Sequence, residues 1–372
     1  MWKHIRTWLI MGLICGLPVQ VWAAAGDTVS LNGSNVLQMP EWAVGDVAAG
    51  GKLLLSDSPE EFYQTGVLYQ DEITGHARLF FHHVNGTAGP KRVAVVLENK
   101  GNKPVKVTLY RKGVAGPHLD YLLVGKTAQE NYFAAQDIEL LEIPAKSAKI
   151  LDKQTADKQI KSKELLNGIY DFVADGPVWV KVLALEAKAN PLREHTKAKV
   201  LPADASRLRG TFPYADRIKI PEKVYDPALG QQVLTLADGS IDPFINGVDA
   251  TDGSAVQNYG NYGVFYKIFV PTAPAEQQSI GFRLNPRGGV YAGALALKIS
   301  TKLQPPVGTP GDRTFLESPD TATDLAQIKP NENLWVQFMP PGASNLPVKL
   351  IITPESPGPE NKGPLEAAQQ PE

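Results

Sequence analysis

The chain has 372 residues, of which 43% are hydrophobic and 20% charged, and its formal net charge is −2. It contains no basic or acidic block, so the composition argues against nucleic-acid binding and gives no sign of a solvating charged arm. The single cysteine, Cys15, lies near the N-terminus, so the rest of the chain has no disulfide, no cysteine nucleophile and no cysteine metal ligand.

The first residues have the pattern of a secretory signal peptide. Lys3 and Arg6 precede an apolar run of roughly 10 residues, and the small residues 23–25 follow it. A membrane span needs about 20 apolar residues, so this run is too short for one. We expect removal of residues 1–25, a mature chain that begins at Gly26, and no stable membrane span afterwards. A retained signal anchor is the alternative.

The pattern beyond residue 50 predicts β-strands almost throughout. Residues 91–113 contain two alternating apolar runs separated by an Asn/Gly/Pro turn, which predicts a hairpin. Residues 168–185 and 334–354 repeat this pattern and predict two more hairpins. The 33 glycines and 30 prolines punctuate short strands, as is typical of β-sandwiches and barrels. The helix candidates are few and short: 127–136 and 155–166.

Two stretches of the chain follow the same order of features. Residues 78–109 and 264–297 both contain an aromatic strand, a link with Pro and Ala, a second strand, an Asn-to-Gly turn and a third strand, which is consistent with an internal duplication. We therefore predict an all-β fold with two β-sandwich-like domains and few short helices. The expected segments are a signal peptide (1–25), an extended segment (26–49), domain 1 (50–204), domain 2 (205–353) and a disordered tail (354–372).

Several motifs between residues 50 and 353 suggest a family. They are RLFFHHVNGT (78–87), LRGTF (208–212), GVDATDGSAVQNYGNYGV (247–264) and PPGASNLPV (340–348). With them the chain resembles a family of exported bacterial proteins of unassigned activity, some of which carry the label "copper amine oxidase N-terminal domain-containing". An amine oxidase needs a Tyr in an Asn-Tyr-Asp/Glu context and an H-x-H copper pair. Here Gly260 follows Tyr259 and no H-x-H occurs, so the resemblance implies neither copper nor any other cofactor.

The adjacent histidines His82 and His83 raise the question of a metal or catalytic site. On a strand, neighbouring side chains point to opposite faces, so the two rings cannot chelate one ion. We expect one histidine against the apolar layer with a backbone hydrogen bond, and the other nearer solvent or a neighbouring loop. A metal site that uses one of them with residues from elsewhere, and a general acid/base role, remain open.

The segment 236–263 is the other candidate site, because long irregular segments in compact domains often carry function. Its Asp, Asn and Gly residues are also typical of turns, its oxygens suit calcium, and its tyrosines suit a sugar surface. No metal ligand set is predicted, because the EF-hand spacing is absent. The candidate ligand-binding residues are Asp249, Asp252, Asn258, Tyr259, Asn261 and Tyr262, together with His82 and Asn85.

No catalytic signature is present: the sequence lacks G-x-S-x-G, H-E-x-x-H, a Walker loop and a dinucleotide fingerprint. The first hypothesis is therefore a non-enzymatic exported protein of the cell envelope or medium that binds a polysaccharide or an envelope protein. The second is a secreted hydrolase that acts on carbohydrate through Asp and Glu residues, which leave no local motif. The third is a structural envelope component.

Overall fold

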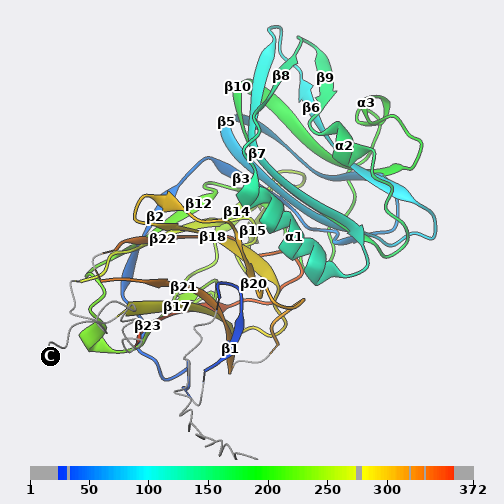
Figure 1. Ribbon diagram of the computed structural model, residues 1–372. Coiled ribbons are helices and arrows are strands. Elements are labelled where there is room, and N and C mark those ends of the chain that lie inside the picture. The colour runs from blue at the N-terminus through cyan, green and yellow to red at the C-terminus, as the bar shows by residue number, and fades with distance from the viewer. Residues whose placement is uncertain (1–23, 32–33, 274–278, 318–319, 331, 356–372) are drawn as a thin grey trace, which may run out of the picture.

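The computed structural model describes residues 24–31, 34–273, 279–317, 320–330 and 332–355, and these residues form an all-β protein (Figure 1). Strands hold 52% of the structure and helices 8%, which confirms the predicted fold class. Most of the predicted signal peptide and tail falls outside the described residues. Within the described part, no helix combines the length and the apolar character that crossing a membrane requires.

The second half of the chain forms a β-sandwich of two sheets. One sheet has five strands, in the order β1 (Thr28–Ser30), β21 (Thr321–Ile328), β17 (Ser279–Pro286), β23 (Val348–Glu355) and β13 (Gln232–Leu236). The other has seven: β19 (Lys302–Leu303), β18 (Gly293–Ile299), β22 (Leu334–Phe338), β16 (Phe265–Val270), β12 (Asp216–Pro221) and β2 (Val44–Ala49), with β20 (Val307–Thr309) beside β18.

The first half is built on one sheet of eleven strands. Its main path is β15 (Ser254–Gln257), β14 (Asn246–Asp249), β11 (Arg209–Phe212), β3 (Lys52–Ser56), β5 (Gly66–Asn85), β10 (Leu165–Glu186), β6 (Lys91–Asn99) and β9 (Ser147–Ile150). The three remaining strands are β4 (Glu61–Phe62) beside β5, β7 (Val105–His118) beside β10, and β8 (Glu139–Ile143) beside β7.

The described helices are short. They are α1 (Tyr121–Ala134), α2 (Lys153–Ala156), α3 (Pro191–Glu194) and the 3₁₀ turn η1 (Pro227–Leu229). The carboxylate of Asp120 caps α1 by accepting a hydrogen bond from the backbone N–H of Leu123 at 3.0 Å. This helix contacts β7 and β10 of the first half and β18 and β20 of the second half, so it bridges the two halves (Figure 1).

The three predicted hairpins are wrong, because in none of them do the two runs form neighbouring strands that pair with each other. Residues 168–185 lie on the single strand β10, in which Asp175, Gly176 and Pro177 form a bulge instead of a turn. The strand β6 pairs with β10 and β9, whereas β7 pairs with β10 and β8. Likewise β22 pairs with β16 and β18, whereas β23 pairs with β17 and β13. The turns after β6 and after β22 therefore lead to strands that do not pair with the preceding one, and the third predicted turn lies within a strand.

The order of strand pairing is repeated in the two halves. In the first half, β3 pairs in parallel with β5, β5 antiparallel with β10, and β10 antiparallel with β7. In the second half, β12, β16, β22 and β18 repeat this order with the same directions. Such a repeat is what an internal duplication produces.

The halves differ in whether strands cross from one layer to the next. In the first half, β5 and β10 are long strands that bend and continue from one layer into the next, with a register shift between Ala174 and Val178. In the second half, two separate strands correspond to each of these long strands: β13 and β16 correspond to β5, and β22 and β23 correspond to β10. The segment between β13 and β16 contains the hairpin β14–β15, which joins the eleven-stranded sheet of the first half by pairing with β11. The candidate segment 236–263 is therefore partly regular.

The expected boundary at residue 205 does not separate the sheets. The strand β2, from the segment expected to be extended, pairs with β12 of the second half. Conversely β11, which lies beyond residue 205, pairs with β3 of the first half. The strand before each parallel pair therefore joins a sheet of the opposite half: β2 precedes β3 and β11 precedes β12. The links 50–51 and 213–215 consequently pass between the halves.

The apolar core follows this exchange. The first half has its own cluster, which includes Leu79, Phe81 and Tyr170. A larger cluster fills the second sandwich and extends into the first half through residues such as Leu53 and Phe80. The two faces of β5 therefore face two different clusters, and the face that carries Phe80 looks toward the second half.

Candidate functional site

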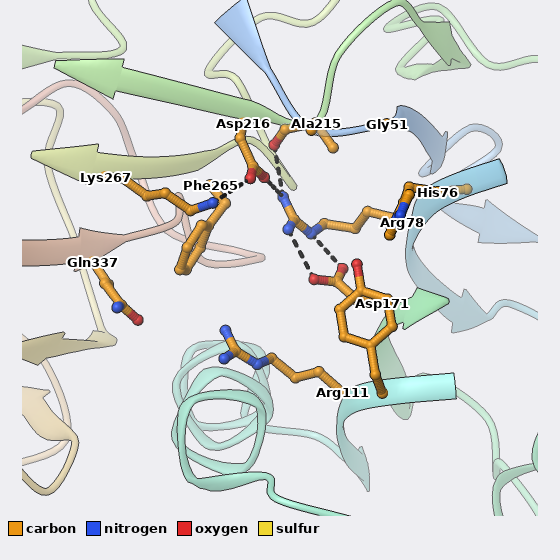
Figure 2. Close-up of a pocket in the computed structure, with 13 residues that line it drawn as sticks. Gly51, His76, Arg78, Arg111, Asp171, Ala215, Asp216, Phe265, Lys267 and Gln337 are labelled. Atoms are coloured by element: carbon orange, nitrogen blue, oxygen red, sulfur yellow. Dashed lines mark hydrogen bonds and ion pairs between the residues drawn. The ribbon is translucent and has the colours of Figure 1, made fainter. Parts of the chain in front are cut away.

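A pocket of about 200 Å³ opens where the two halves meet. We call it the basic pocket. Figure 2 shows its polar side chains converging from both halves of the molecule. Its lining residues are Gly50, Gly51, His76, Ala77, Arg78, Tyr110, Arg111, Asp171, Ala215, Asp216, Phe265, Lys267 and Gln337.

The chain exchange brings these residues together. Gly51, in the link between β2 and β3, lies directly against β5, and a Cβ atom there would overlap the carbonyl oxygen of His76. Gly50 has a φ of 76°, a backbone conformation that favours glycine. The sequence Gly50-Gly51 thus allows the link to pass close over β5, beside Ala215 from the other link.

Arg78 forms the buried floor of the basic pocket. Its Nε and Nη2 donate to the two carboxylate oxygens of Asp171, at 2.6 and 2.9 Å, and its Nη1 lies 3.0 Å from Asp216. Nη1 also donates to the carbonyl oxygen of Ala215 at 2.6 Å. Burial acts to lower the pKa of Arg78, but the interactions with Asp171, Tyr132 and Asp216 outweigh burial and raise that pKa above its usual value. The guanidinium therefore stays charged and ties together β5, β10 and the link before β12.

Tyr132 of α1 completes the floor. Its hydroxyl donates to Oδ2 of Asp171 at 2.7 Å. Burial, only partly offset by Arg78, raises the pKa of Tyr132, so the hydroxyl keeps its proton and remains a donor. The carboxylate of Asp171 thus accepts three hydrogen bonds in a buried site, and these bonds hold it in place within the fold.

The rim of the pocket carries excess positive charge. Arg111 is half-buried, and its guanidinium lies over the rings of Tyr132 and Phe265, 5.1 and 5.9 Å from their centroids. Among the described residues, no carboxylate lies within ion-pair distance of Arg111, whereas Lys267 pairs with Asp216 at 2.7 Å. Three permanent cations, Arg78, Arg111 and Lys267, therefore face two carboxylates in this pocket. The surplus charge can hold an anion.

The mouth of the pocket carries two aromatic rings. His76 and Tyr110 are both exposed and meet edge to face, with their centroids 6.2 Å apart. Tyr110 is 37% exposed, and its partial burial raises the pKa of the phenol to about 12, so its hydroxyl stays protonated at neutral pH. The two rings offer apolar faces and polar edges to a ligand outside the pocket.

The double histidine does not belong to the basic pocket. His82 and His83 point to opposite faces of β5, as predicted: His83 stacks on Phe81, and His82 lies on the face of Phe80. The nitrogens of His83 lie 2.9 Å from Ser56 Oγ and 3.0 Å from the carbonyl oxygen of Pro59. Of the two expected positions for the second ring, solvent and a neighbouring loop, His82 takes the second: it lies against Gly342 in the loop before β23, and both histidines are at most 2% exposed.

Burial keeps both rings uncharged. It lowers the pKa of His82 to about 3 and the pKa of His83 to about 4. In the part of the chain that the structure describes, no three His, Cys, Asp or Glu side chains are grouped to hold a metal ion.

The structure places most of the other predicted site residues in local turn and core interactions. Asp249 is buried in an ion pair with Arg209 at 2.7 Å. Asp252 pairs with the exposed Arg207 at 3.0 Å. The side-chain amide of Asn85 donates to the carbonyl oxygen of Ile160 at 2.8 Å. These contacts join segments of the fold, and none of these residues lines the basic pocket.

The remaining four lie near the end of the 236–263 segment. Asn258 donates from its side chain to the backbone carbonyl of Tyr262 at 2.8 Å. Asn261 donates to the hydroxyl of the buried Tyr266, also at 2.8 Å. Tyr259 is 56% exposed and packs edge-on against Phe244. Of all the predicted residues, the structure brings only Tyr262 and His82 to one pocket, which is separate from the basic pocket.

Sequence reasoning missed Arg78, Arg111, Asp171, Asp216 and Lys267. A signal for two of them was present, since Arg78 in "ARLFF" and Asp171 in "IYDFV" are charged residues inside otherwise apolar strands. Such residues are almost never fully buried unless they are paired. That rule predicts partners for each, but it does not identify them.

Comparisons with known proteins leave the chain without an assigned family. No family model and no curated protein sequence matches it. Among solved structures, it is similar to the Lactobacillus farciminis oxalate decarboxylase formate complex at 6% identity, covering 91% of this chain and 87% of the other, with a TM-score of 0.16. The CUB1-EGF-CUB2 domains of rat MASP-1 give 6% identity, coverage of 79% and 99%, and a TM-score of 0.21. TM-scores this low carry no inference about function.

Proposed function

We propose that this chain is a non-enzymatic exported protein of the cell envelope or medium that binds an acidic polysaccharide, with one carboxylate or sulfate group seated in the basic pocket. The observation that carries the proposal is Arg111. Its guanidinium is fixed over two rings and has no carboxylate partner among the described residues. A planar guanidinium held in place binds a carboxylate or sulfate through paired hydrogen bonds.

The size of the pocket supports a polymer side group over a whole small ligand. Sites that enclose a small molecule usually measure about 300–1,000 Å³, whereas this pocket measures about 200 Å³. One charged group fits inside, and the rest of the ligand must lie outside. The exposed rings of His76 and Tyr110 lie where a sugar next to that group would pass, and they offer it apolar faces.

The alternative of a carbohydrate hydrolase finds less support in this pocket. A glycosidase needs one carboxyl group free to protonate the leaving oxygen and a second free to act as nucleophile or base. Here Asp171 accepts from Arg78 and Tyr132, and Asp216 lies against Arg78 and Lys267. Both carboxylates are engaged by cations, so neither is free for either role.

The test is calorimetric titration of the mature protein with de-esterified polygalacturonate, its methyl ester and an acidic polypeptide such as polyglutamate. We expect binding to the free acid that weakens with added salt, and no binding to the neutral ester. Arg111→Gln should weaken binding about tenfold or more, since a charge-assisted hydrogen bond contributes about 1.5–3 kcal/mol. Arg193→Gln, an exposed arginine on α3, is the matched control and should bind as the wild type does.

Three outcomes would contradict the proposal. Equal binding of the acid and its ester would show that the charge of the ligand plays no part. Binding of polyglutamate but not of the polysaccharide would instead indicate an acidic protein partner. Release of shorter sugars during incubation would establish the hydrolase.

A further inference from the structure

A second pocket, of about 550 Å³, has the opposite charge. We call it the acidic pocket. It lies on the same face of β5 as the basic pocket, four residues further along the strand from Arg78. The lining contains three acidic residues and no lysine or arginine. Its residues are Asp57, Glu60, His82, Leu119, Asp120, Tyr121, Leu122, Leu208, Tyr262, Ala343, Ser344 and Asn345.

Two polar groups in this lining are buried without a hydrogen-bond partner among the residues that the structure describes. They are Oδ1 of Asp57 and Nδ1 of His82, in residues that are 8% and 2% exposed. Buried polar groups are normally satisfied by a partner, and one left alone costs about 1–3 kcal/mol of stability. Two such atoms in the wall of one pocket indicate a missing partner with hydrogen-bond donors.

The missing partner must also carry positive charge. Burial, then repulsion from Glu60 and Asp204, raises the pKa of Asp57. Burial and Asp204 also raise the pKa of Glu60. No cation in the pocket relieves this repulsion, in contrast to Asp171, which has Arg78 at 2.6 Å. A ligand cation would supply both the charge and the donors that these groups lack.

The remaining walls select the kind of cation. Leu119, Leu122 and Leu208 supply apolar surface, and the rings of Tyr121 and Tyr262 supply aromatic surface. Such walls suit an alkyl stem, and aromatic rings also attract cations. A bare metal ion finds no three-ligand group among the described residues.

A glycine allows the backbone of the second half to pack closely against His82. Gly342 lies against the ring, and a Cβ atom there would come 2.5 Å from Nδ1. The next residues, Ala343 to Asn345, form the adjoining wall, and Tyr262 fixes that wall by donating from its hydroxyl to the carbonyl oxygen of Ser344 at 2.9 Å. This hydrogen bond holds one wall of the cavity in place.

We infer that the acidic pocket binds a primary ammonium group on an apolar stem, such as a lysine side chain or a free alkylamine. The carboxylate of Asp57 takes the ammonium, His82 offers its ring nitrogen as an acceptor, and the leucines and tyrosines enclose the stem. This site is independent of the basic pocket, so either proposal can fail without the other.

The test is a titration of the protein with n-butylammonium, followed by amide chemical shifts in NMR spectra. We expect saturable shifts at residues of the acidic pocket, such as Leu122 and Ser344, and none with n-butanol or butyrate. Asp57→Asn should weaken binding about tenfold or more, because the variant lacks the charge that the ammonium needs. The matched control is Asp137→Asn, an exposed aspartate after α1, which should leave binding unchanged.

A second pair of probes distinguishes the sources of the ammonium. An acetylated, amidated Gly-Lys-Gly peptide represents a lysine side chain, and putrescine represents a free amine. Tighter binding of the peptide would assign the site to a protein partner, and tighter binding of putrescine to a small amine; both are forms of the inference. Absence of saturation with butylammonium, equal shifts with butanol, or unchanged binding by Asp57→Asn would each overturn it.

Discussion

The two pockets on the Phe80 face of β5 differ in whether their buried charges have partners of opposite sign. Arg78 and His82 are four residues apart, or about 13 Å along a strand. At the basic pocket, Arg78 has carboxylates on two sides, so the buried charges compensate one another. At the acidic pocket, Asp57 has other acids nearby and no cation in the lining. The first arrangement supports the fold, whereas the second costs stability and is explained by a ligand.

The comparison predicts opposite signs for two Asp-to-Asn substitutions, and Asp171→Asn should have the largest effect. It removes the charge that compensates the buried guanidinium of Arg78. Breaking a buried pair on one side typically costs about 3–5 kcal/mol, so we expect a decrease of that size in the unfolding free energy measured with urea. The exposed Asp137→Asn should leave the midpoint unchanged. A loss below about 1 kcal/mol for Asp171→Asn, as for a surface ion pair, would remove the contrast between the pockets.

His83 provides a reference on the other face of the same strand. It is buried and fully partnered, by Ser56 and by the carbonyl oxygen of Pro59, and it lies outside both pockets. His83→Ala should lower the unfolding free energy by about 1–3 kcal/mol, the usual cost of leaving buried partners unpaired. Elemental analysis of the wild type, His82→Ala and His83→Ala should show the same metal content. Stoichiometric zinc or copper that is lost in one variant without loss of fold would make the pair a metal site.

The sequence predicts the strands of this fold much better than their partners. Alternation along β5 placed Phe80 and His82 on one face and Phe81 and His83 on the other, and it did so because side-chain direction is a local property of a strand. Pairing is not local. The turn at 99–105 and the bulge at 175–177 both contain Gly and Pro beside Asn or Asp. The first links β6 and β7, which do not pair with each other, whereas the second lies within one strand. Tertiary packing decides between these outcomes.

The site was harder to predict because it forms where chain segments cross. Arg78 and Asp171 face each other across β5 and β10, and Asp216 joins them because the link before β12 passes between the halves, where β2 and β11 are exchanged. The 236–263 segment attracted attention for its Asp and Asn content, yet Asp249 and Asn261 serve local contacts and buried pairs. Only His82 and Tyr262 reached a pocket, and a buried histidine beside a glycine cannot be identified from composition.

Asp57→Asn should have the opposite effect from Asp171→Asn. It removes a buried charge that no cation compensates, so we expect the protein to become more stable at neutral pH by about 1 kcal/mol, the usual size of a stabilising substitution. The variant should lose butylammonium binding at the same time. Destabilisation by Asp57→Asn would instead show that the carboxylate of Asp57 has a partner in the fold and that the acidic pocket has no uncompensated charge.

The stabilisation by Asp57→Asn should also depend on pH, with the smallest of these effects. Burial, then Glu60 and Asp204, holds the pKa of Asp57 above the value of about 3.9 expected in an unfolded chain. The fold therefore favours the protonated carboxyl, and the penalty is absent below that unfolded value and grows as pH rises through the folded pKa. Thermal midpoints of wild type and Asp57→Asn should differ most at neutral pH and converge toward pH of about 4.

Three neighbours bear on that convergence. His82, with a pKa of about 3, stays neutral throughout this range and adds no charge. Glu60 has a raised pKa too, so it loses its charge over the same range and reduces the repulsion on Asp57 as pH falls. Asp204 keeps its charge longest. Partial burial acts to raise its pKa, but hydrogen bonds from Ser206, Glu60 and Ser58 outweigh this effect and lower the pKa. A difference between the two midpoints that stays constant from neutral pH to about pH 4 would mean that Asn improves packing at this position, because a contribution from the charge on Asp57 would disappear over this range.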